Sequence, residues 1–89
     1  MSGGHFGYAQ YKIEQISDQI AEIIRRNDTS EFPFSPAVIQ RMTEALRQLG
    51  ISFVYAQRID FLVSGDDDEE IFEKRLKEDL EILEDEGKT

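Results

Sequence analysis

Apolar residues in the first third of the chain recur at intervals of three and four positions. The repeating residues are Phe6, Ala9, Ile13, Ile16, Ile20 and Ile23. This spacing places them along one face of a helix, as in the a and d positions of a heptad repeat. It predicts a helix over residues 6–26 with a seam for a neighbouring helix, and it leaves Tyr8 and Tyr11 beside that seam for a second contact.

A second helical pattern starts at Ser35 and Pro36, which are typical of a helix cap and a first helical residue. Apolar residues then follow at helical spacing up to Gly50, which leaves two interpretations open. Either the helix continues to residue 64, or residues 51–63, rich in β-branched and aromatic side chains, form strands. We favour one long helix because the dipeptide between those strands, Gln57-Arg58, makes a poor hairpin turn.

The connection between these two patterns, residues 27–35, carries two aromatic side chains. Pro33 and the polar residues around it interrupt the helical periodicity. Because Phe32 and Phe34 are apolar, we expect the loop to fold down onto one end of the core.

A tight turn is predicted where the long central pattern ends, and its turn and cap residues are Ser64, Gly65, Asp66 and Asp67. A glycine just past a helix end supplies the left-handed residue that closes the last turn. The aspartates after it, Asp68 included, can cap the following helix. Residues 67–86 then carry an apolar stripe in a charged background, which predicts a third helix.

These patterns predict an all-α single domain of three helices, over residues 6–26, 36–64 and 67–86, in an up-down arrangement with a long central helix. Residues 1–5 are expected to be a flexible N-terminus and residues 87–89 a tail. At ~1.5 Å per residue the central helix measures about 43 Å and its neighbours about 30 Å. Two shorter helices cannot cover it from all sides, so some apolar side chains should stay exposed.

Exposed apolar patches usually mark an interface, and for this chain we expect a dimer. The candidate interface residues are Tyr8, Tyr11, Phe53, Tyr55 and Phe61. The first helix could also use its heptad seam against the central helix of its own chain.

Charge and composition narrow the range of partners. The chain has 89 residues and a net charge of −9, and residues 66–86 hold twelve of its 19 acidic residues. Such a surface attracts a basic protein and disfavours nucleic acid, which needs a basic face. The sequence has no cysteine, no apolar run of the ~20 residues that a membrane helix needs, and no secretory signal layout at its start. We therefore predict a cytoplasmic protein with no membrane partner.

Candidate chemistry is sparse, and no catalytic, cofactor-binding or metal-binding residue is predicted. Asp66, Asp67 and Asp68 with Asp60 could hold a metal ion, but their spacing lacks the pattern of a calcium-binding loop. Consecutive acids at a helix start more often act as caps. Arg58 and Asp60 lie in an apolar run and could pair across the bundle with Glu14 or Arg26, while His5 in its glycine-rich tip is expected to be solvated.

Two blocks, MSGGHFGY at the start and YAQRIDFLVSGDD further on, carry a resemblance. The chain resembles a group of small uncharacterised bacterial and phage-associated proteins that open with MSGG and share a Tyr-Ala-x-Arg-Ile-Asp-aromatic-Leu-x-Ser-Gly-Asp-Asp block. The resemblance implies a helix, a turn at Gly65 and a further helix, in a bacterial or prophage setting. It carries over no catalytic residue.

The leading hypothesis is a non-enzymatic acidic helical protein that binds a copy of itself, a basic protein, or both. One version is an inhibitor that presents carboxylates where DNA would present phosphates. The alternatives are a small metal-dependent enzyme that uses Asp60 and the aspartates at 66–68, and a nucleic-acid-associated regulator, which the charge disfavours.

Overall fold

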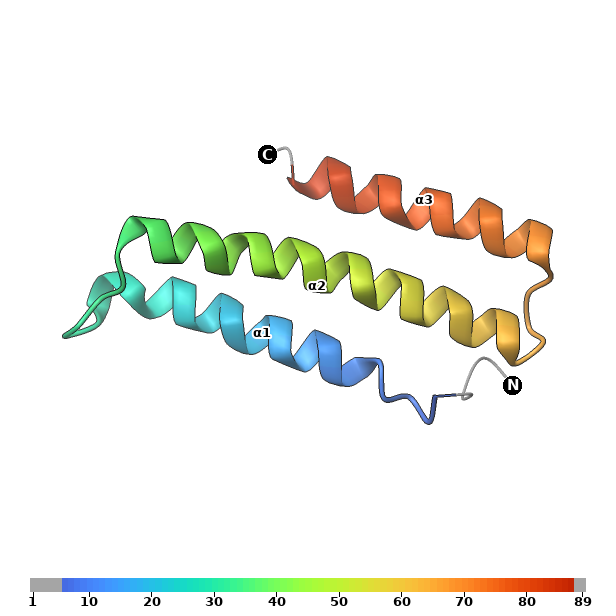
Figure 1. Ribbon diagram of the computed structural model, residues 1–89, viewed down its shortest axis with the longest axis horizontal. Coiled ribbons are helices and arrows are strands. Elements are labelled where there is room, and N and C mark those ends of the chain that lie inside the picture. The colour runs from blue at the N-terminus through green and yellow to red at the C-terminus, as the bar shows by residue number, and fades with distance from the viewer. Residues whose placement is uncertain (1–5, 88–89) are drawn as a thin grey trace.

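The computed structural model describes residues 6–87, and they form three helices with no strand among them. Helix α1 spans Tyr11–Arg26, α2 spans Pro36–Val63 and α3 spans Glu69–Gly87, with a single 3₁₀ turn, η1, at Asn27–Thr29. Successive helices run in opposite directions, and the long α2 lies between the other two (Figure 1). The predicted all-α, up-down arrangement is confirmed, and the helical interpretation of residues 51–63 holds over the strand one.

The start of α1 differs from the prediction, because the helix begins at Tyr11 and not at Phe6. Gly7 and Tyr8 have φ angles of 60° and 61°, in the left-handed region. A right-handed helix cannot continue through such residues, so the segment from Phe6 to Gln10 forms turns instead. The spacing of apolar residues alone could not reveal this break.

The loop before α2 is held by the side chain of Asn27. Its Oδ1 accepts a hydrogen bond from the backbone N–H of Phe34 at 2.9 Å, and its Nδ2 donates to the Phe34 carbonyl at 3.3 Å. Ser35 then caps α2, with Oγ accepting from the N–H of Val38 at 3.4 Å. The expectation that the loop covers the core is wrong, since Phe32 is 80% exposed: the bonds to Asn27 hold the loop in a conformation that projects this ring into solvent.

The turn between α2 and α3 follows the hydrogen-bond pattern of a Schellman motif. Gly65 has a φ of 84°, its N–H donates to the carbonyl of Leu62 at 3.2 Å, and the N–H of Asp66 donates to that of Phe61 at 2.9 Å. Of the three aspartates that could cap the next helix, Asp68 does so, its Oδ1 accepting from the N–H of Ile71 at 2.8 Å. Helix α3 therefore begins at Glu69 and not at residue 67, and Asp66 and Asp67 lie in the turn.

The three helices form one flat layer. Helices α1 and α3 both pack on α2 and make no contact with each other, and the molecule measures 50 × 27 × 14 Å. Helix α3 ends well short of the first turns of α2, which only α1 flanks (Figure 1). Among the described residues no apolar side chain is fully buried, and the two buried residues, Gln10 and Asp60, are polar.

Candidate functional site

A buried polar cluster joins the end of α2 to the residue before α1. Asp60 is 1% exposed and Gln10 is 4% exposed. Gln10 Nε2 donates hydrogen bonds to Gln57 Oε1 at 2.8 Å and to Asp60 Oδ2 at 3.0 Å. Ser64 Oγ donates to Asp60 Oδ1 at 3.4 Å. Buried polar groups of this kind fix how two elements align, because any shift leaves them unpaired in a dry environment.

The partners of Asp60 and Arg58 differ from those predicted, Glu14 and Arg26. Asp60 lies on the side of α2 that meets the segment preceding α1, and there it bonds to Gln10. Arg58 lies two residues earlier, about 200° around the helix, and therefore meets α3 instead. Sequence spacing showed that both side chains must be accommodated in an apolar run but did not show which neighbour each one faces.

Arg58 links α2 to the turn and to α3. Its Nη1 lies 3.5 Å from Asp67 Oδ2, and its Nε lies 3.4 Å from Asp79 Oδ2. The Nε contact is an ion pair without hydrogen-bond geometry. The guanidinium also stacks over the ring of Phe61 at 4.6 Å, and only 13% of the Arg58 side chain is exposed. A cation between two carboxylates and an aromatic ring holds α3 against α2.

The residues of the metal hypothesis have other roles in the fold. Asp60 is bonded to Gln10 and Ser64, Asp67 pairs with Arg58, and Asp68 caps α3. Within residues 6–87 no group of three acidic or histidine side chains is placed to share a metal ion. His5 lies outside the described residues.

The five candidate interface residues do not form one continuous surface. Tyr8 and Tyr11 are exposed, with their ring centroids 6.4 Å apart, and the Tyr11 ring lies 5.6 Å from that of Phe53. Phe53 is half-buried in this aromatic row, and Phe61 is half-buried beneath Arg58. Tyr55 is exposed on α2.

Several exposed aliphatic residues were not among those candidates. Ile16 and Ile23 of α1 are 49% and 45% exposed, and Val38, Ile59 and Val63 of α2 are exposed too. Ile16 and Ile23 belong to the predicted seam, but only part of that seam packs against α2: Ile13 and Ile20 are half-buried. Apart from Val63, the signal that could have identified these residues is their spacing by seven residues, or a multiple of seven, within α1 and within α2.

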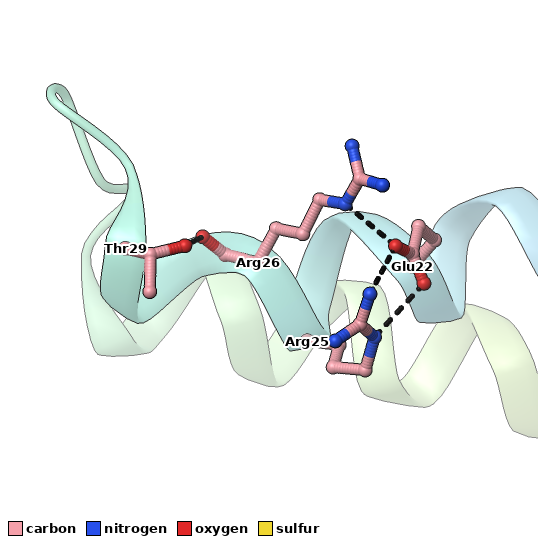
Figure 2. Close-up of polar contacts among 4 residues, drawn as sticks. All are labelled: Glu22, Arg25, Arg26 and Thr29. Atoms are coloured by element: carbon pink, nitrogen blue, oxygen red, sulfur yellow. Dashed lines mark hydrogen bonds and ion pairs between the residues drawn. The ribbon is translucent and has the colours of Figure 1, made fainter.

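The C-terminal end of α1 holds a cluster of one carboxylate and two guanidinium groups. Figure 2 shows the Glu22 carboxylate bonded to the guanidinium groups of both Arg25 and Arg26. The Arg26 Nε contact is 2.6 Å, and the hydrogen bond from Arg25 is the largest cause that lowers the pKa of Glu22 from 4.5 to about 2. In the same view the hydroxyl of Thr29 donates to the carbonyl of Arg26 at 3.1 Å. The cluster therefore keeps one net positive charge, which suits the negative C-terminal end of the helix dipole.

Comparisons of the chain with protein-family models, with curated proteins and with solved structures find no match. Over residues 6–87, none of the helices combines the length and apolar character needed to cross a membrane.

Proposed function

We propose that this protein is a non-enzymatic helical interaction protein that works as a self-associated assembly. The observation that supports this most directly is the single layer of helices. Stable domains place at least two layers of secondary structure around an apolar core. Here one layer stands alone, and none of the apolar side chains described in residues 6–85 is fully buried. A second copy of the chain would supply the missing layer.

The dimensions of the chain support the same proposal. It exposes 6815 Å², about 1,400 Å² more than the ~5,400 Å² expected for a compact protein of 10.3 kDa. Its radius of gyration is 15.9 Å, against about 12 Å for a compact chain of this length. The excess area is larger than the ~800 Å² that each partner contributes to a standard interface.

The charge distribution supports a basic protein as a second partner of the proposed assembly. Helix α3 holds nine acidic and three basic residues, whereas α1 holds three of each. An outward α3 would attract a basic protein surface and repel nucleic acid. A cytoplasmic role in a bacterium or prophage is part of this proposal and is supported by the sequence resemblance.

Sedimentation equilibrium at about 10 and 100 μM tests self-association, because these concentrations lie above typical specific dissociation constants. We expect the mass of a dimer at 100 μM. A monomeric mass there would overturn the proposal. A pull-down from a bacterial lysate, with a chain whose α3 glutamates are changed to glutamine as control, then tests the basic partner: capture should require the charged helix.

A further inference from the structure

Helices α1 and α2 share one repeating pattern where they meet. The half-buried residues that recur every seven positions are Ile13 and Ile20 on α1 and Met42, Leu49 and Ala56 on α2. Three positions after these come a second set of apolar or small residues, which we call the outer stripe: Ile16 and Ile23 on α1, and Ala45, Ser52 and Ile59 on α2. Val38 extends the outer stripe of α2 by one repeat. Ile16, Ile23, Val38, Ser52 and Ile59 are exposed, and Ala45 is half-exposed.

The outer stripes of the two helices lie on the same side of the layer. Three residues turn a helix by 300°, which is 60° back from the facing position. In a pair of antiparallel helices, side chains that are rotated by the same angle and in the same sense about their own helix axes, starting from the facing positions, lie on the same side of the layer. The buried cluster shows the same rule for the other side of the layer. Gln10 lies three residues before Ile13 and Asp60 lies three residues before Val63, so both are rotated by about 60° in the opposite sense, and their side chains meet.

Helix α3 lies away from the outer stripe. A Cβ at Gly50 would be 3.7 Å from Leu83 Cδ2, so Gly50 faces α3. Gly50 follows the facing residue Leu49 by one position, a rotation of 100° in the sense opposite to that of Ser52. The acidic helix therefore leaves the outer stripe uncovered and does not surround it with negative charge.

We infer that a second copy of the chain packs its outer stripe against this one, so that the two α1–α2 hairpins form a four-helix bundle with both α3 helices outside. This inference rests on the proposed self-association and names its surface. The charge balance favours a second copy over other occupants: α1 is neutral and α2 carries three basic and two acidic residues, so the paired hairpins repel each other little.

The sizes of the stripe residues are complementary between two copies. Gln10 bonds to Gln57 and Asp60, and this register places Ile16 level with Ser52 and Ile23 level with Ala45. Each level thus pairs a large side chain on α1 with a small one on α2. A two-fold axis parallel to the helices places Ile16 over the partner's Ser52, where the isoleucine fills the space that serine leaves.

Cysteine cross-linking tests this geometry directly, because the chain has no cysteine of its own. Two otherwise unaltered proteins, Ile16→Cys and Ser52→Cys, are mixed and treated with a short thiol-reactive cross-linker. We expect covalent dimers from the mixture and few from either protein alone. A mixture of Ile82→Cys and Ser52→Cys is the control, since Ile82 lies exposed on α3. Covalent dimers from the control mixture but not from the test mixture would overturn the inference.

A charge substitution gives an independent test that separates this surface from self-association itself. The double variant Ile16→Glu with Ile23→Glu should raise the dimer dissociation constant at least about 100-fold. The matched variant on α3, Ile71→Glu with Ile82→Glu, should leave it within about three-fold, with helix content of both checked by circular dichroism. A monomeric wild type would refute the proposed function. A dimer that resists the α1 change would leave self-association intact and refute the four-helix bundle.

Discussion

Gln10 Nε2 donates a hydrogen bond to Asp60 Oδ2 at 3.0 Å, and these two polar side chains are the only buried ones in residues 6–85. The contact ties the turn before α1 to the last turns of α2. It therefore sets the alignment of the α1–α2 hairpin on which the proposed dimer depends.

Gln10→Ala should destabilise the protein by about 1–3 kcal/mol, because it removes two hydrogen bonds and one of them ends on a buried carboxylate. Gln15→Ala, a change of the same kind at an exposed position of α1, should cost less than about 0.5 kcal/mol. Urea unfolding of both variants measures the difference. Equal midpoints would show that the cluster contributes no stability.

The same substitution at two glycines should have opposite effects. Gly65 has a φ of 84°, so Gly65→Ala should cost about 1 kcal/mol through backbone strain. Gly50 lies inside α2, and an added Cβ meets Leu83 at an ordinary contact distance of 3.7 Å. Gly50→Ala should therefore stabilise the protein by about 0.5–1 kcal/mol. Thermal unfolding of both variants checks the signs, and a stabilising Gly65→Ala would contradict the left-handed cap.

The α3 cap is tested at Asp68, whose Oδ1 accepts from the N–H of Ile71. Asp68→Ala should cost about 1 kcal/mol, whereas Asp68→Asn keeps the acceptor and should cost only a few tenths. Denaturant titrations at neutral pH compare the two. If asparagine is as harmful as alanine, the negative charge matters at this position more than the hydrogen bond.

The sequence predicted caps and turns that depend on single residues better than it predicted contacts between distant parts of the chain. The turn at Gly65 and the cap at Ser35 follow from the preferences of single residues, and both appear where the sequence places them. The left-handed Tyr8 does not, because tyrosine has no preference for that conformation and the apolar spacing continues through it. For Asp60 we predicted an ion pair across the bundle. The sequence places this carboxylate in an apolar run, but it does not reveal which side chain lies opposite.

The outer stripe was not predicted as an interface, for a related reason. A three-four repeat defines two stripes on a helix, and the sequence does not say whether one neighbour covers both. In this fold α2 partly covers Ile13 and Ile20 but leaves Ile16 and Ile23 exposed. Only the packing angle of the hairpin, set by side chains on two helices together, decides which stripe remains open.

The pH dependence of stability should reveal Glu22. Its pKa is lowered to about 2 in the folded chain from 4.5, so the unfolded state binds more protons between these values and stability rises with pH there. The contribution of Glu22 is fully present above about pH 5 and is lost as the pH falls through 2. The difference in stability between the wild type and Glu22→Gln should therefore be constant at neutral pH and shrink below pH 4.5. An unchanged difference at pH 3 and pH 7 would contradict the lowered pKa.

Salt should tighten the proposed dimer or leave it unchanged. Each chain carries a net charge of −9, concentrated on α3 and the turn before it, so two approaching copies repel each other at long range. The proposed interface consists of aliphatic and small side chains, which added salt does not weaken. At 0.5 M salt the Debye length is only about 4 Å, and most of the repulsion is screened. Sedimentation equilibrium at 20 and 500 mM sodium chloride should give an equal or lower dissociation constant at the higher salt. A dimer that dissociates in salt would instead be held by charge pairs, and its interface would have to include the acidic α3.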